Sequence, residues 1–195
     1  MNTSALKRFA QQARNILKSG VEKQLIQWGY NPKTKRFETE PQVIGGGALF
    51  GSKMIEDTDF NSKWQALRSA VQSKGAGQVV EEAAYTWFNR LIAVRFMEVN
   101  EYIPSRVRVI SSESAGKDEP DLVTNPFDTD LDFTPYEKDR IMQLKQENQL
   151  DELFRLLFIK QCNALNAILP NLFEKTSDYT ELLLNVAFTD KEGVV

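Results

Sequence analysis

The sequence contains no histidine and only one cysteine, Cys162, among its 195 residues. Histidine is the usual general base, the usual partner of a serine or cysteine nucleophile and the commonest zinc ligand. Its absence excludes serine and cysteine triads and leaves a poor donor set for zinc. The single cysteine cannot form an intrachain disulfide, and its apolar neighbours indicate core filling. An active site in this chain could therefore use only carboxylates, lysines or a phosphate-binding loop, or the chain has no active site.

Long hydrophobic runs are also missing. No apolar run approaches the roughly 18 residues that a membrane helix needs. The opening MNTSALKRFAQQARNILKSG has no solid hydrophobic block of the kind found in secretory signals. With 42% hydrophobic and 26% charged residues, the composition is that of an ordinary globular protein. We therefore expect a soluble, cytoplasmic protein with a sizeable core and no membrane partner.

Charge is unevenly spread along the chain. Residues 1–100 hold 14 Lys and Arg against 9 Asp and Glu, and residues 101–195 hold 10 against 18. Within the first 36 residues the only acid is Glu22. Such a basic segment can neutralise DNA phosphates, although a solvated helix face has the same composition. The candidates for contact with DNA are Lys7, Arg8, Arg14, Lys18, Lys33, Lys35 and Arg36.

Apolar residues recur at helical spacing through most of the chain. They predict helices over residues 6–28, 60–71, 78–102, 135–148, 150–169 and 179–188. Helix caps are predicted at Asp59, at Asp178 and, as a capping box with Glu137, at Thr134. The fold class is therefore predicted to be all-α, an irregular bundle of about five to seven helices with at most a minor hairpin near residues 38–50.

The predicted helix over residues 78–102 is apolar nearly all round, which is typical of a helix in the middle of a bundle. Its polar members need partners there, because buried charge is tolerated only when it is paired. These candidates for structural ion pairs or an interface are Asn89, Arg90, Arg95 and Glu98. The expected partners of Arg90 and Arg95 are Glu81, Glu82, Glu98 or the acidic second half of the chain.

Two short motifs resemble sites of chemistry without matching them. The glycines of residues 45–51 lack both the GxxxxGK[ST] and the GxGxxG spacing, so we interpret them as a turn. Residues 121–127 contain Asn125-Pro126-Phe127, but the Asn-Pro-Pro-aromatic tetrad of amino methyltransferases needs a second proline. Closely spaced acids at Asp128, Asp130 and Asp132 could bind Mg²⁺, but an acidic loop is usually solvated. We predict no catalytic, cofactor-binding or metal-binding residue in this chain.

Three strings carry a resemblance to a known family. They are MNTSALKRFAQQAR at the start, AYTWFNRLIAVRFMEVN at residues 84–100 and RVISSE at residues 108–113. The chain resembles the amino-terminal region of the PglX (BrxX) family, the large adenine-specific DNA methyltransferases of type 1 BREX phage-defence systems. The resemblance spans essentially all 195 residues but only the head of the family's much longer proteins.

The resemblance implies that residues 1–195 form a helical domain of a longer methyltransferase whose Rossmann-like catalytic domain lies further along. The parent protein would use S-adenosylmethionine to methylate the exocyclic amine of adenine in double-stranded DNA. This segment would be non-catalytic and would support DNA binding, docking of the catalytic domain of the same chain, or both. An interaction module that binds other BREX proteins or a phage inhibitor, without touching DNA, is the alternative.

Overall fold

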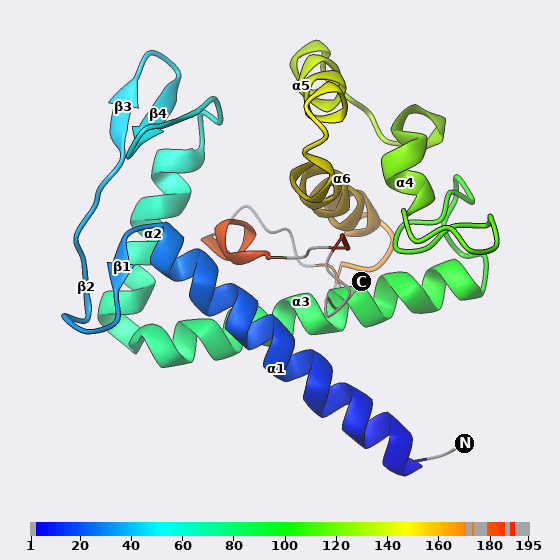
Figure 1. The fold of residues 1–195 in the computed structure, drawn as a ribbon, viewed down its shortest axis with the longest axis horizontal. Helices are drawn as coiled ribbons and strands as arrows, with labels where there is room; N and C mark the ends of the chain where they lie inside the picture. The colour runs from blue at the N-terminus through cyan, green and yellow to red at the C-terminus, as the bar shows by residue number, and fades with distance from the viewer. Residues whose placement is uncertain (1–2, 171–172, 174–178, 186–187, 190–195) are drawn as a thin grey trace. The chain divides into compact units, whose positions relative to one another are not determined.

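The structure is a computed structural model that describes residues 3–170, 173, 179–185 and 188–189. The chain divides into two compact units, unit 1 with residues 1–87 and 176–185 and unit 2 with residues 88–175 and 186–195. The helices shown in Figure 1 are α1 (Thr3–Gln27), α2 (Phe60–Lys74), α3 (Ala76–Val99), α4 (Asp121–Thr124), α5 (Pro135–Gln146) and α6 (Leu150–Leu165). Two short 3-10 helices are η1 (Pro126–Asp128) and η2 (Tyr179–Leu183). Across these described ranges, no helix is long and apolar enough to cross a membrane.

Two small antiparallel sheets follow α1 in unit 1. The first is a hairpin of β1 (Tyr30–Asn31) and β2 (Arg36–Phe37), and the second has the order β3 (Gln42–Ile44), β4 (Gly47–Phe50) and β5 (Lys53–Ile55). The prediction of a mainly helical chain is confirmed, but all-α is too narrow a class. The predicted hairpin is only the β3–β4 part of a larger sheet. Strands of two to four residues are too short to show an alternating pattern in the sequence.

The glycine-rich segment builds the turn between β3 and β4. Gly45 and Gly46 have φ values of 45° and 100°, and the flanking residues Ile44 and Gly47 face each other across the hairpin. A two-residue hairpin loop with positive φ at both central positions favours glycine, because other residues are strained there. The segment is therefore a hairpin turn, as its lack of phosphate-loop spacing indicates.

Tryptophan side chains hold unit 1 together. The indole N–H of Trp28 donates to the carbonyl of Leu182 at 2.7 Å, and that of Trp87 donates to the carbonyl of Thr180 at 3.0 Å. Trp64 in turn donates to the carbonyl of Trp28 at 3.0 Å. All three side chains are buried. These bonds tie η2, which lies against both α1 and α2, to a part of the chain some 90 to 150 residues earlier (Figure 1).

Aromatic contacts attach the strands to this core. Phe37 of β2 lies edge-on to Trp64 of α2 with ring centroids 5.3 Å apart. Phe50 of β4 meets Trp28 in the same way at 5.5 Å. Phe60, at the start of α2, completes the group at 5.0 Å from Trp28. Edge-to-face aromatic pairs contribute beyond their buried area, so very short strands can be held by side-chain packing.

A partly buried ion pair also joins α2 to η2. The ammonium of Lys63 lies 3.0 Å from a carboxylate oxygen of Glu181 and 3.1 Å from one of Asp57. Burial disfavours the charged form of Lys63, but the charges and hydrogen bonds of Glu181 and Asp57 outweigh it and raise the pKa of Lys63. The lysine therefore stays charged at neutral pH and supports the attachment of η2.

Unit 2 is built around α6, which packs against α4 and α5 (Figure 1). The buried residues of α6 recur at helical spacing, as its sequence predicts. Its fully covered apolar residues are Leu153, Phe154, Leu157, Phe158, Cys162 and Leu165. From the neighbouring helices, Leu122, Ile141 and Leu144 are buried with them.

Two of the three predicted helix caps fall on described residues, and both stand at the predicted cap positions, but only Thr134 makes a cap hydrogen bond through its side chain. Thr134 and Glu137 form the predicted capping box, with the Glu137 N–H donating to Thr134 Oγ1 at 3.2 Å and the Thr134 N–H donating to Glu137 at 2.8 Å. Asp59 stands at the cap position of α2, but its side chain makes no cap hydrogen bond. Instead, the preceding acid Asp57 accepts the Asp59 N–H at 2.9 Å. Asp178 lies outside the described residues.

The prediction that the third helix is surrounded on all sides is wrong. One side of α3 is buried through Trp87, Leu91, Val94 and Met97. The other side exposes apolar residues, and these are Tyr85, Ile92, Phe96 and Val99. Periodicity alone cannot distinguish a fully packed helix from one whose second apolar side stays uncovered.

We expect Trp28→Phe to lower the free energy of unfolding by about 1–3 kcal/mol, because the aromatic packing is kept but the buried carbonyl of Leu182 loses its donor. Denaturant unfolding followed by circular dichroism measures the change. The matched control is Tyr85→Phe, which removes a hydroxyl from an exposed ring on α3 and should change stability by less than about 0.5 kcal/mol. Equal effects of the two variants would contradict the role of the indole bond.

Thr134→Ala should destabilise the protein by about 1 kcal/mol, since it removes the oxygen that caps α5. Asp59→Ala should have little effect, because the Asp59 side chain makes no cap bond. The two variants are compared in the same denaturant titration. A larger loss for Asp59→Ala than for Thr134→Ala would show that the cap assignment is wrong.

Candidate functional site

The seven basic residues predicted to contact DNA all lie in unit 1, but they do not form one patch. Lys7 and Arg8 stand near the amino end of α1, and a second group, Lys33, Lys35 and Arg36, lies on the β1–β2 hairpin beyond its carboxyl end. A helix of 25 residues is about 37 Å long. The two groups are therefore separated by most of the length of α1.

The two candidates that lie between these groups, Arg14 and Lys18, already have a partner. Arg14 lies 2.6 Å from a carboxylate oxygen of Glu81 on α3, and Lys18 is bonded to the other oxygen of the same carboxylate. Hydrogen bonds from Lys18 and Arg14 lower the pKa of Glu81, so the acid stays ionised. Arg14 and Lys18 therefore serve first to pair α1 with α3.

The remaining five basic residues are exposed. Among the residues that the structure describes, no carboxylate lies within 4.0 Å of Lys7, Arg8, Lys33, Lys35 or Arg36. The first turn of α1 also carries no acidic residue. Positive side chains near a helix amino terminus gain nothing from the helix dipole. Helix stability therefore does not account for the position of Lys7 and Arg8.

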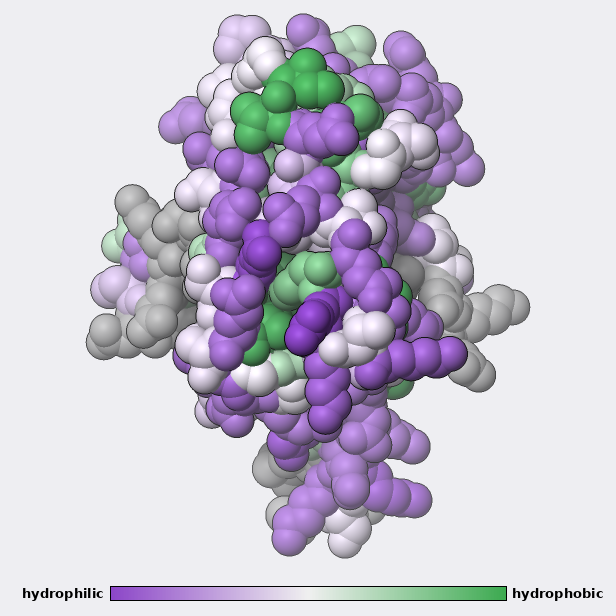
Figure 2. Space-filling model, turned by 90° about the vertical axis from the view of Figure 1, so that its left-hand side faces the viewer, coloured by the Kyte–Doolittle hydropathy of each residue, from purple (hydrophilic) through white to green (hydrophobic). Residues whose placement is uncertain are grey.

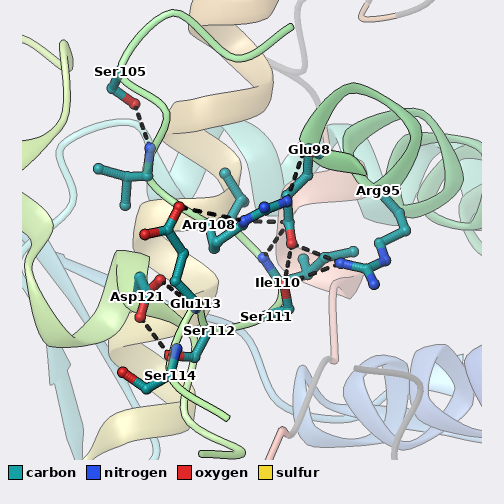
Figure 3. A network of polar contacts seen from close by, with 12 residues as sticks. Arg95, Glu98, Ser105, Arg108, Ile110, Ser111, Ser112, Glu113, Ser114 and Asp121 are labelled. Atoms are coloured by element: carbon teal, nitrogen blue, oxygen red, sulfur yellow. Dashed lines mark hydrogen bonds and ion pairs between the residues drawn. The ribbon is translucent and has the colours of Figure 1, made fainter. Parts of the chain in front are cut away.

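A second cluster is centred on Glu98, whose side chain is only 1% exposed although α3 carries it at its carboxyl end. Figure 3 shows its carboxylate facing the segment that follows the helix. The backbone N–H groups of Val109 and Ile110 donate to one oxygen at 3.1 and 3.0 Å. Arg95 donates to the other oxygen at 2.7 Å, and the hydroxyl of Ser111 bonds to that oxygen too. Four donors thus bond to one buried carboxylate.

The segment RVISSE, residues 108–113, is fixed at a second point on α4. The hydroxyl of Ser112 donates to Asp121 at 2.6 Å, and the Glu113 N–H donates to its other oxygen at 2.9 Å (Figure 3). The guanidinium of Arg108 donates to the backbone carbonyl of Glu98 at 2.8 Å. Two of the strings that carry the family resemblance therefore meet here, because Arg95 and Glu98 belong to one of them and RVISSE is the other. Sequence reasoning did not predict this contact. The signal that could have indicated it is that both strings occur together in the family.

Arg95 pairs with Glu98, which is one of the expected partners, whereas Glu81 is bonded to Arg14 and Lys18 of α1. Glu82 accepts from Lys74 at 2.8 Å. Asn89 is half-buried and Arg90 is buried. Burial raises the pKa of Cys162 to about 12, and the nearby charge of Arg90 opposes this only in part. The thiol is therefore protonated at neutral pH and unsuited to act as a nucleophile.

Beside the Glu98 cluster is a small pocket of about 130 Å³, lined by residues that include Glu101, Arg106 and Arg108. Sites for small molecules typically measure about 300–1,000 Å³, so a cofactor of the size of S-adenosylmethionine does not fit. In the described part of the chain, no group of three or more acids or cysteines could hold a metal ion.

The three-stranded sheet presents an apolar surface to solvent. Figure 2 shows this hydrophobic area at the top of the view, surrounded by hydrophilic residues. Val43, Ile44 and Met54 are 68%, 44% and 48% exposed. Leu49 of β4 pairs with Met54 of β5. Contiguous apolar surface of this kind is typical of a contact with another protein surface.

We expect Glu98→Ala to reduce the free energy of unfolding by about 2–5 kcal/mol, because the N–H groups of Val109 and Ile110 would each lose an acceptor worth about 1–3 kcal/mol. Urea denaturation measures this loss. Glu101→Gln is the control, because Glu101 is exposed next to the same helix end and should change stability by less than about 0.5 kcal/mol. A loss below about 1 kcal/mol for Glu98→Ala would contradict the assignment.

Comparison with known proteins gives two relatives that cover this chain. The adenine-specific methyltransferase PglX of Lacticaseibacillus casei (strain Zhang) is 34% identical over 209 residues, which include 100% of this chain and 17% of the relative. The adenine-specific methyltransferase BrxX of Escherichia coli O9:H4 (strain HS) is 32% identical over 195 residues, with 97% of this chain and 16% of the relative covered. No protein-family model matches.

The chain thus spans about one sixth of the length of these two relatives, and the matched part is their amino-terminal region. The match extends over the basic residues of α1, the β1–β2 hairpin and the Glu98 cluster alike, since it covers all or nearly all of the chain. Over its whole length this chain therefore corresponds to the amino-terminal region of the PglX (BrxX) family of adenine-specific methyltransferases, the family that its sequence resembles.

Proposed function

We propose that this chain is the amino-terminal, non-catalytic segment of an adenine-N6 DNA methyltransferase of a BREX phage-defence system and that it contacts the DNA backbone. The parent protein would take its methyl group from S-adenosylmethionine, bound outside residues 1–195. The relatives support the parent's activity through their names. The small pocket and the buried Cys162 give no support to a reaction within this segment.

The observation that carries the DNA contact is the group of exposed basic residues that have no carboxylate partner in the part of the chain that the structure describes. Lys33, Lys35 and Arg36 project from a two-stranded hairpin held by Phe37 against α2. Lys7 and Arg8 form the second group, near the other end of α1. Lysine and arginine that neutralise phosphates release counterions from DNA and so supply affinity without reading the bases.

The separation of the two groups has a consequence for the geometry of binding. The two basic groups are separated by most of a 25-residue helix. Both groups can bind phosphates at the same time only if they contact different parts of the DNA backbone. Arg14 and Lys18 lie between them and would have to exchange Glu81 for a phosphate. We therefore assign the main contacts to the hairpin and the amino end of α1, with Arg14 and Lys18 contributing less.

A protein-interaction module is the second candidate. It is favoured by the exposed apolar surface of Val43, Ile44 and Met54 on the three-stranded sheet. Other BREX proteins or a phage inhibitor are the partners that this candidate would bind. The acidic stretch over residues 118–139 is a further surface for it, since Asp128, Asp130 and Asp132 are exposed. Binding of such partners by a protein that fails to bind DNA would favour this candidate.

In the full-length methyltransferase, we expect replacing Lys33, Lys35 and Arg36 together by alanine to flatten the salt dependence of DNA binding. The slope of log K against log salt is negative, and each lost phosphate contact reduces its magnitude by about 0.9, so the magnitude should fall by up to about 2.7. Fluorescence anisotropy with a labelled duplex across a salt series measures it.

The matched control for this experiment is Arg14→Ala with Lys18→Ala, which removes two positive charges that Glu81 already pairs. Its slope should change less per charge than that of the hairpin variant. An unaltered slope in the hairpin variant, together with unaltered binding by a Lys7→Ala and Arg8→Ala variant, would refute the DNA contact.

A further inference from the structure

Four apolar side chains form an exposed stripe along the second half of α3 and just beyond it. They are Ile92, Phe96, Val99 and Tyr102, hereafter the α3 stripe, with exposed fractions of 44%, 60%, 57% and 60%. Steps of four and three residues place the first three on one side of the helix. All four belong to unit 2, so the stripe is a surface of that unit alone.

The end of α3 holds the stripe in a fixed shape. Glu101 adopts a left-handed conformation with φ 58°, the Tyr102 N–H donates to the Met97 carbonyl at 2.8 Å, and the Glu101 N–H donates to the Glu98 carbonyl at 3.2 Å. These bonds form a Schellman motif, in which the last residue packs back on the helix. The rings of Tyr102 and Phe96 accordingly meet with centroids 6.0 Å apart.

This motif explains why Tyr102 rests on Phe96, but it does not require either ring to stay open to solvent. It also gives no reason for Ile92 and Val99 to extend the apolar surface along the helix. From the buried side, Glu98 fixes the same turn of α3 to residues 109–111. A surface that is ordered before it meets a partner loses little conformational entropy on binding.

The size of the stripe decides what kind of partner can cover it. Since a buried aromatic ring covers about 150–250 Å², two rings at 60% exposure contribute roughly 120 Å² each and the stripe roughly 400 Å² in all. A stable interface between separate molecules needs about 800 Å² on each partner. The stripe is too small to hold a second copy of this chain. A segment tethered in the same polypeptide needs less area, because its effective concentration reaches the millimolar range.

We infer that the α3 stripe is the docking site of an apolar segment of the same polypeptide, in the part that follows this region in full-length members of the family. That part exists in both relatives, because the chain matches only the amino-terminal 17% and 16% of their length. The inference rests on one part of the proposed function, namely that this chain belongs to a longer methyltransferase. It does not depend on the proposed contact with DNA.

The test uses the full-length protein and a photoreactive residue. Phe96→p-benzoylphenylalanine is introduced, the purified protein is irradiated, and the attached peptide is identified by mass spectrometry. Val99→p-benzoylphenylalanine is the second position, in case the larger group disturbs the ring of Tyr102. The matched control is Tyr136→p-benzoylphenylalanine, an aromatic position on α5 that is 51% exposed.

The expected result is an adduct between the α3 stripe and a peptide from outside residues 1–195 of the same molecule, with that adduct absent from the control. Mixing isotope-labelled and unlabelled protein separates this result from an adduct to a second copy. An adduct to a second copy, an adduct to another protein, or no adduct at either stripe position would overturn the inference.

The parent methyltransferase is tested separately by the mass of the endogenous protein, detected with an antibody to this segment. A species several times larger than 22.3 kDa is expected. A native species of 22.3 kDa would overturn the proposed function together with this inference, whereas a large species without the adduct would overturn only this inference.

Discussion

The three indole N–H bonds are the constraint on which unit 1 depends. Trp28, Trp64 and Trp87 are buried, and a buried indole N–H without an acceptor would be costly. Each finds its acceptor in a backbone carbonyl, and two of these carbonyls belong to residues 180–182. Because both of those donors come from the first 87 residues, the chain must return to unit 1 after building most of unit 2. The packing of α1, α2 and the strands then follows around the same aromatic group.

In unit 2, the buried carboxylate of Glu98 holds separate segments together, as the indole bonds do in unit 1. The carboxylate of Glu98 is covered and accepts hydrogen bonds from four donors, three of them from residues 109–111. A charge in such a position is tolerated only when it is well bonded, so the loop after α3 has little freedom to move away. Asp121 repeats the arrangement from α4. An otherwise irregular loop is thereby held between two helices, and the end of α3 is fixed with its apolar stripe facing outward.

In unit 1, some basic residues form ion pairs that hold the helices together, and others are exposed and available to a partner. Glu81 uses Arg14 and Lys18 to hold α1 against α3, which leaves the basic residues on either side of them exposed. A basic segment that looks continuous in the sequence is thus divided into a paired middle and two open ends. The open ends are suited to phosphates, and the apolar surfaces on the sheet and on α3 are suited to protein contacts. Both kinds of surface are consistent with a segment that works beside other domains.

Five of the predicted helices, the capping box at Thr134 and the family could be predicted from the sequence, because these depend on local spacing or on the identity of strings such as RVISSE. The helix predicted over residues 179–188 is wrong in type and length, since the described residues there form only the 3-10 helix η2, which ends at Leu183, and the short helix α4 was not predicted. The sequence could not determine the five short strands, since two to four residues carry no clear period. The candidate site was predictable only as a set of residue types. Which basic residues are paired depends on Glu81, which lies more than 60 residues further along the chain. This pairing, the burial of Glu98 and the exposure of the α3 stripe follow only from the folded chain, because each depends on contacts between segments that are distant in the sequence.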